Sequence, residues 1–362
     1  MKNYIAFDIA SEVSVVCVMN ESGKIVMPST PVPTNTESLK QVVKGFRHPR
    51  IVTFEECSQA AWLYSVLSPV ADDVLVCDPK KNYHLSGDNK SDKMDAYNLC
   101  DRLRSGVLKR VWHGGDRVES LRQLAHSYQE LTKDSTRLKL RLKALFRSRG
   151  IQVSDELYDS KMQGELIAKL PIAEQRTRAL HLADLLERVT QRREQAYKDM
   201  VRLASRDKMY QAVISIPQFG EVFTSLFIAT VCTPHRFRTR GQFCSYAGFA
   251  VSTYESSEYE LDPRGRACKK SRKVRTRGLT KSFNRTLKYI FNSAAVALKS
   301  RDWKEPYQAM IDAGVSPDHA RLTLARKLAA ITLHIAKTGE MYDKNIAFPM
   351  KQISIVASDQ TS

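Results

Sequence analysis

Short apolar runs alternate with amphipathic runs at the beginning of the chain. The apolar runs end at polar or turn residues, which is typical of strands in a buried sheet. The amphipathic runs repeat apolar residues every three or four positions, as one face of a helix requires. We predict strands over residues 4–9, 13–19, 24–28, 51–54 and 74–76, and helices that begin near Asn35, Ala60 and Asp92. Residues 1–110 are therefore predicted to form an α/β domain with a mixed sheet.

Two longer amphipathic patterns follow this domain. Leucines recur at heptad spacing between Arg117 and Leu145, and a second helical pattern runs from Pro171 to Leu203. The two stripes predict a helical hairpin or coiled coil over residues 111–208. An intramolecular hairpin and a dimerisation arm would bury the same stripe, so the sequence leaves both interpretations open.

The remaining part of the chain is predicted to be mainly α-helical. The turn Ile216-Pro217-x-x-Gly220 precedes an apolar helix, as in a helix-hairpin-helix whose turn amides approach a DNA phosphate, although a simple helix cap has the same pattern. A last helix begins at Ser316-Pro317 and ends at Gly339. We place a C-terminal domain at residues 209–345 and a flexible tail at residues 346–362.

The composition points to a polyanion as partner. Lys and Arg number 57 against 39 Asp and Glu, which favours nucleic acid first and an anionic membrane surface second. No apolar run approaches the roughly 20 residues that span a bilayer, so we expect no membrane partner. The seven cysteines are scattered and never form C-x-x-C, which favours a reducing cytoplasm and argues against zinc.

The densest charge lies between Arg264 and Lys288, where eleven Lys or Arg residues stand without an acid. Such a run is typical of a solvated loop, but in a chain this basic it also favours phosphate contact. The candidate nucleic-acid-binding residues are Arg264, Arg266, Lys269, Lys270, Arg272, Lys273, Arg275, Arg277, Lys281 and Arg285.

Four acids stand where surface charge is hard to explain. Asp92 and Asp95 lie three residues apart, on one face of a helix that Ser91 would cap. Asp8 lies within one apolar run and Glu56 ends another, and a buried acid is costly unless it is paired or binds a metal. Glu55 would point to the opposite face of its strand from Glu56, so we expect no role for it.

The order of elements and the positions of the acids resemble a ribonuclease-H-like (RuvC-like) fold. Such a fold carries acids on its first strand, after its fourth strand and on its last helix.

Nearly the whole chain resembles the DEDD-type serine transposases, or recombinases, of bacterial insertion sequences (insertion-sequence family one-ten), which are related to Piv-type DNA invertases. The matching motifs are Ile5-x-x-Asp8, Glu56-Cys57-Ser58, Lys90-Ser91-Asp92-x-x-Asp95-Ala96, Ile216-Pro217-x-x-Gly220, Tyr246-Ala247-Gly248 and Tyr254-Glu255-Ser256. Three positions depart from the family near the serine: Val251 replaces a common proline, and Ser257 and Phe283 replace common glycines.

The resemblance implies an activity and its site. Ser256, or its neighbour Ser257, would be the nucleophile and form a covalent phosphoserine with DNA. Asp8, Glu56, Asp92 and Asp95 would be catalytic and would hold Mg²⁺, as two ions, with Mn²⁺ able to substitute.

The resemblance also implies partners. A non-coding bridge RNA would pair with donor and target DNA, and homodimers would assemble into a tetramer in the bacterial cytoplasm, at the nucleoid. Two other functions stay open: a RuvC-like Holliday-junction nuclease that uses water, and a non-catalytic nucleic-acid-binding protein.

Overall fold

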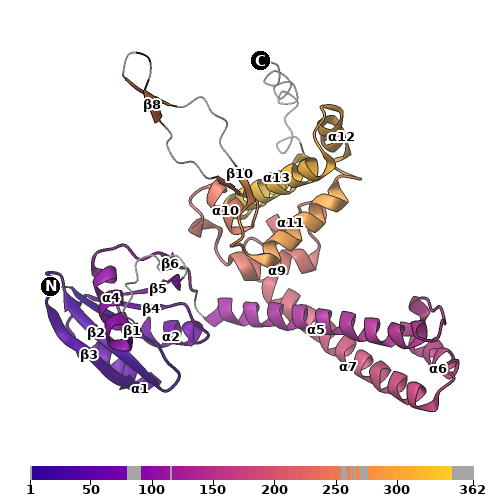
Figure 1. The fold of residues 1–362 in the computed structure, drawn as a ribbon, viewed down its shortest axis with the longest axis horizontal. Helices are drawn as coiled ribbons and strands as arrows, with labels where there is room; N and C mark the ends of the chain where they lie inside the picture. The colour runs from indigo at the N-terminus through magenta and orange to yellow at the C-terminus, as the bar shows by residue number, and fades with distance from the viewer. Residues whose placement is uncertain are drawn as a thin grey trace. The chain divides into compact units, whose positions relative to one another are not determined.

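The computed structural model describes residues 2–79, 91–114, 116–253, 259–261, 263, 266–269 and 276–344. The chain divides into two compact units, Met1–Glu119 and Ser120–Ser362, which are described one at a time (Figure 1). Within the described residues, no helix is long and apolar enough to cross a membrane.

The first unit is built on a six-stranded mixed sheet with the strand order β3-β2-β1-β4-β5-β6. Its strands are β1 (Asn3–Asp8), β2 (Val13–Asn20), β3 (Ile25–Pro33), β4 (Arg50–Glu55), β5 (Asp73–Cys77) and β6 (Arg110–Val111). β1 pairs antiparallel with β2 and parallel with β4, and β4 pairs parallel with β5. β1 is therefore the central strand at which the sheet changes from antiparallel to parallel pairing.

Helices cover both faces of this sheet. The helices are α1 (Thr36–Lys44), α2 (Ala60–Leu67) and α4 (Asp92–Arg104). Side chains alternate along β1, so Ile5 and Phe7 pack in the core beneath α1 and α2, whereas Ala6 packs in the core beneath α4. The predicted mixed α/β domain is confirmed, and its strand order is consistent in general with a ribonuclease-H-like fold.

The edge strands differ most from the sequence prediction. β3 continues to Pro33, beyond the predicted end at residue 28, although it contains Pro28, Pro31 and Pro33. An edge strand tolerates proline because the N–H groups on its free side have no partner strand, and proline there blocks further pairing. The two-residue strand β6 was too short to show a periodic pattern.

Two 32-residue helices, α5 (Asp116–Arg147) and α7 (Ala173–Ala204), dominate the first part of the second unit. Over part of their length the two helices share one apolar core, which contains the fully buried Leu142 and Phe146 of α5 and Leu182 and Leu186 of α7. A short 3₁₀ helix, η2 (Asp155–Tyr158), and α6 (Ser160–Ala168) lie between them in sequence, and Leu157 and Ile167 join the same core. The two helices thus form an intramolecular hairpin.

The rest of the second unit is mainly helical, as predicted. Its helices are α8 (Tyr210–Ile214), α9 (Glu221–Val231), η3 (Pro234–Arg236), α10 (Arg240–Tyr246), α11 (Arg285–Leu298), α12 (Lys304–Asp312) and α13 (Pro317–Thr338). Phe227, Phe243 and Phe291 lie at its centre, with ring centroids 5.8–6.3 Å apart. α13 begins after Ser316 and ends at Gly339, which has the left-handed conformation expected of a helix C-terminus.

Candidate active site

Asp8 is the last residue of β1 and lies on the face of the sheet that α4 covers. Ala6 packs in the core beneath α4, and the side chain two positions later points to the same face. The carboxyl group is partly buried. Burial, followed by the negative charges of Asp95, Asp92 and Glu55, raises its pKa to about 6. The negative charges of three other carboxylates therefore act on the acid at the end of the central strand.

Asp92 and Asp95 occupy the first turn of α4, as their spacing predicted. Ser91 is the N-cap, and its side chain accepts a hydrogen bond from the Met94 amide at 3.4 Å. Both aspartates are exposed. Acids are favourable at a helix N-terminus because they face the positive end of the helix dipole and the unpaired amides.

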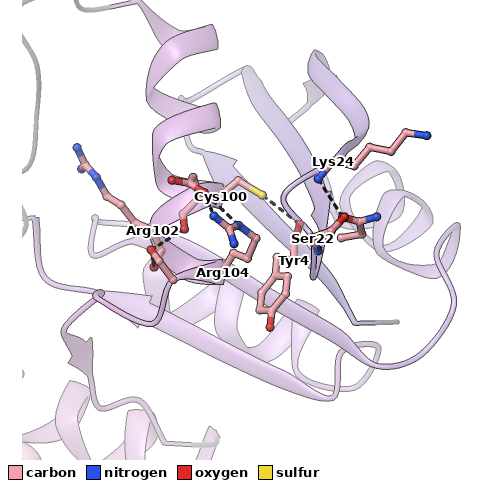
Figure 2. A network of polar contacts seen from close by, with 9 residues as sticks. Tyr4, Ser22, Lys24, Cys100, Arg102 and Arg104 are labelled. Carbon is pink, nitrogen blue, oxygen red and sulfur yellow. Dashed lines mark hydrogen bonds and ion pairs between the residues drawn. The ribbon is translucent and has the colours of Figure 1, made fainter.

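The position of this acid pair depends on how α4 packs on the sheet. Ala96, Leu99 and Cys100 are buried against the sheet residues Ala6 and Cys17. The Cys100 thiol donates a hydrogen bond to the Tyr4 carbonyl of β1 at 3.1 Å, which Figure 2 shows as a dashed line from the helix to the strand. One turn later, Arg104 pairs with Asp101 of the same helix at 2.6 Å.

Glu55, for which the sequence predicted no role, lies on the same face of the sheet as Asp8. Phe7 of β1 pairs with Phe54 of β4, so the next residues in each strand, Asp8 and Glu55, continue side by side. Ile51 of β4 packs on the α4 face and Phe54 on the other, so alternation places Glu55 on the α4 face. Burial raises the pKa of Glu55; the positive charge of Arg102 opposes this rise, and the negative charge of Asp95 adds to it.

Glu56, the acid that the sequence favoured, has a different environment. It follows the end of β4, and its carboxylate lies 2.6 Å from the Nε2 atom of His113. The His113 side chain is 6% exposed and stacks on Tyr64 of α2, with ring centroids 5.5 Å apart. Sequence reasoning missed His113, because a single histidine after a two-residue strand has no motif around it.

The carboxylates suit a divalent cation by their chemistry. Asp8, Asp92, Asp95 and Glu55 offer only oxygen ligands, and the charges of the other three add to burial in raising the pKa of Asp8. Mg²⁺ and Mn²⁺ prefer such oxygen donors. In the part of the chain that the structure describes, however, no three His, Cys, Asp or Glu side chains have the arrangement of a metal site.

The predicted serine, its neighbour and half of the ten predicted nucleic-acid-binding residues lie outside the described residues. These are Ser256, Ser257, Arg264, Lys270, Arg272, Lys273 and Arg275. The other predicted nucleic-acid-binding residues are Arg266, which is exposed, Lys269 in β9, Arg277 in β10, and Lys281 and Arg285, both exposed.

A short strand pair closes the segment that contains Ser256. β7 (Val251–Thr253) pairs antiparallel with β10 (Thr276–Leu279), with Thr253 opposite Thr276. A second pair, β8 (Tyr259–Leu261) and β9 (Ala267–Lys269), lies within this segment. In sequence, Ser256 and the basic residues from Arg264 to Arg275 therefore lie between β7 and β10.

The residues before β7 are tightly packed. Arg326 of α13 donates a hydrogen bond from Nε to the Phe249 carbonyl at 2.7 Å. Gly248 has a φ of 80°, and a Cβ atom at this position would lie 2.7 Å from the ring of Phe283. Phe283, which replaces a common glycine of the family, thus packs directly on the turn that precedes the serine segment.

Comparison with known proteins gives the identity of both parts of the chain. A family model described as a transposase, for the DEDD transposases of IS110, matches residues 5–149. A second model, described as the transposase of the IS116/IS110/IS902 family, matches residues 210–308. A search of curated proteins found no match to the chain.

The two matches follow one another along the chain and together cover more than half of it. A DEDD transposase domain implies dependence on a divalent metal in general, and a transposase implies DNA as the substrate. The chain therefore belongs to the IS110 family of transposases and is a DNA-recombining enzyme.

Proposed function

We propose that this transposase cuts and rejoins DNA through a covalent phosphoserine, with Ser256 as nucleophile and a carboxylate group of the first unit as the metal site. The observation that carries the proposal is the position of Asp8 at the end of β1, on the face that α4 covers, where the charges of Asp95 and Asp92 add to burial in raising its pKa to about 6. An acid of β1 and two acids of α4 would not be kept in mutual repulsion without a compensating cation.

The carboxylates would hold a pair of Mg²⁺ ions, with Mn²⁺ as a substitute. Asp8, Asp92 and Asp95 supply three of the four acids, and the end of β4 supplies the fourth. There Glu55 follows Phe54, the register partner of Phe7, just as Asp8 follows Phe7, whereas Glu56 is paired with His113. Bound divalent cations at such a site neutralise phosphate oxygens and stabilise the attacking and leaving oxygens.

Ser256 would carry out the covalent step. Its Oγ atom forms a bond to the phosphorus of the DNA backbone, the bond to one DNA oxygen breaks, and the hydroxyl proton leaves to solvent. A DNA hydroxyl then displaces the serine, which restores the phosphodiester. The pairing of β7 with β10 supports this role, because it fixes the ends of the segment that contains the serine.

A non-coding bridge RNA would choose the sites by pairing with donor and target DNA, while the protein binds backbone and shape. This division of roles is the one used by other RNA-guided enzymes. The excess of 57 Lys and Arg over 39 Asp and Glu supports binding to several nucleic-acid strands. We further propose that homodimers pair into a tetramer, which would hold four DNA ends.

One experiment tests the catalytic proposal. The protein is incubated with Mg²⁺, the non-coding RNA that flanks its element, and DNA with both sites, and the mixture is then denatured. We expect a protein–DNA adduct with the wild type, and none with Ser256→Ala or Asp92→Asn. Ser257→Ala is the matched control for the serine, since it alters the neighbouring hydroxyl.

Each other outcome identifies a different function. Strand cutting that persists in Ser256→Ala without an adduct would favour a nuclease that uses water. Binding without cutting in any variant would favour a non-catalytic protein. An adduct that forms equally without RNA would remove the guide from the proposal.

A further inference from the structure

The two long helices of the hairpin differ in charge. Residues 133–149, at the end of α5 and just beyond it, contain seven Lys or Arg and one acid, Asp134. α7 also contains seven Lys or Arg, but five Asp or Glu accompany them. Only the end of α5 therefore presents a strong local excess of positive charge.

Three of the seven cations of α7 are paired along their own helix. Arg188 pairs with Asp184 at 3.0 Å, and Arg202 pairs with Asp199 at 2.8 Å. Lys198 lies 3.8 Å from Glu194. Such pairs at one-turn spacing are the usual way in which an exposed helix face compensates its own charge.

Four cations of α5 form a stripe on the exposed side of the helix, and we call it the α5 basic stripe. Its members are Lys133, Arg137, Arg141 and Arg147, all exposed. At 3.6 residues per turn they project to one side, roughly opposite the buried Leu142. Over 14 positions the stripe is about 21 Å long.

Little compensates the charge of this stripe. Arg137 donates to Asp134 at 3.0 Å, and both side chains remain largely open to solvent. Lys133, Arg141 and Arg147 have no ion-pair partner among the residues that the structure describes. Ala144, Ser148 and Leu140, which is 63% exposed, stand between the cations on the same side of the helix.

We infer that the α5 basic stripe binds the phosphate backbone of a nucleic-acid duplex, as a site separate from the basic segment around residues 264–285. The partner follows from the chemistry. A row of exposed guanidinium and ammonium groups matches a linear polyanion, and a second copy of the same stripe would be repelled. The inference rests on the proposed function only in taking nucleic acid as the partner.

The test measures binding of the full-length protein to two duplexes of unrelated sequence, one of DNA and one of RNA, across a series of salt concentrations. Lys133, Arg137, Arg141 and Arg147 are together changed to Gln, which preserves helix propensity. The matched control changes Arg178, Arg188, Arg192 and Lys198 of α7 to Gln. Both variants lose the same total charge from the same hairpin.

We expect the stripe variant to bind at least about tenfold more weakly near physiological salt, and the slope of log affinity against log salt to fall by about 3 to 4 for DNA. The α7 control should change the slope by less than about 1. A change confined to the RNA duplex would assign the stripe to RNA, and a change confined to DNA would assign it to DNA.

Equal effects of the two variants, or none, would overturn the inference, because global charge would then explain the binding. Circular dichroism and thermal unfolding check that both variants fold, and the single variants Arg141→Gln and Arg147→Gln repeat the test with smaller changes. The experiment measures duplex binding and does not depend on strand cutting. A negative result for the stripe would therefore leave the proposed catalytic function open, and absence of the protein–DNA adduct would leave the binding test valid.

Discussion

Asp8 combines two unfavourable conditions, partial burial and nearby like charges. The burial contributes most to its raised pKa, and Asp95 and Asp92 follow. The folded protein consequently holds a proton on Asp8 more tightly than the unfolded chain does. The protonated form contributes stability that is fully present below the ordinary pKa near 3.8 and is lost as the pH rises through about 6.

The variant Asp8→Asn should therefore stabilise the metal-free protein at high pH. At pH 8 we expect its free energy of unfolding to exceed that of the wild type by on the order of 1 kcal/mol, after allowance for solvent screening. It should therefore unfold at a higher denaturant concentration. The advantage should shrink towards pH 4. Denaturation in the presence of a chelator measures it, with the exposed Glu165→Gln as control. A difference that does not vary with pH would refute the electrostatic interpretation.

Two neighbouring glutamates at the end of β4 are proposed to have different roles. Glu55 would bind the metal, whereas Glu56 is paired with His113. We expect Glu55→Gln to lower DNA cutting and Mn²⁺ affinity by about 100-fold, and Glu56→Gln by about tenfold or less. The reason is that Glu55 continues the strand beside Asp8, whereas Glu56 is held by His113. Calorimetric titration with Mn²⁺ checks the binding without catalysis. The reverse order of effects would restore Glu56 as the fourth acid.

The two acids of α4 could be predicted from the sequence, but the acid at the end of β4 that faces Asp8 could not. Asp92 and Asp95 are related by local helical spacing, which a sequence shows directly. Whether Glu55 or Glu56 faces Asp8 depends on the β1–β4 register and on the residue at which β4 ends. That register is set by packing between strands distant in sequence, and a one-residue difference reverses the face.

At the scale of elements, periodic patterns predicted the helices and central strands closely. α1 begins at Thr36, α2 spans Ala60–Leu67 and α4 begins at Asp92, as expected. The hairpin showed the limit of this approach, because the leucine stripe fitted both an intramolecular and an intermolecular pairing. The structure pairs α5 with α7 of the same chain, and dimerisation through this hairpin remains a prediction.

The hairpin core can be tested with two leucines of α5 that stand one position on either side of Arg141. Leu142 is fully buried against α7, whereas Leu140 is 63% exposed. We expect Leu142→Ala to lower the unfolding free energy by about 2–5 kcal/mol, because it leaves a cavity. Leu140→Ala should change it by less than about 0.5 kcal/mol. Urea denaturation measures both.

Equal effects of the two leucine variants would contradict the intramolecular packing. A loss of dimer on Leu140→Ala, seen by sedimentation without a loss of monomer stability, would instead support the dimerisation arm. The exposed Leu180 and Leu185 of α7 would then be the next positions to change.

At the scale of the whole molecule, the proposed chemistry is divided between two units. The acids belong to Met1–Glu119, whereas Ser256 belongs to Ser120–Ser362. Ser256 could act with the acids of its own chain or with those of another chain. We propose the second arrangement, in which acids of one subunit act with the serine of another.

Mixing two inactive variants distinguishes these arrangements. Asp92→Asn keeps the serine and Ser256→Ala keeps the acids, so a mixed dimer with shared sites regains one intact site. After exchange of subunits at equal amounts we expect about a quarter of the wild-type protein–DNA adduct, since half of the dimers are mixed and each has one of two sites. The double variant mixed with each single variant should remain inactive. If each site instead uses the acids and the serine of the same chain, mixtures of the two single variants will also be inactive. Every chain in such a mixture lacks one of the two required groups.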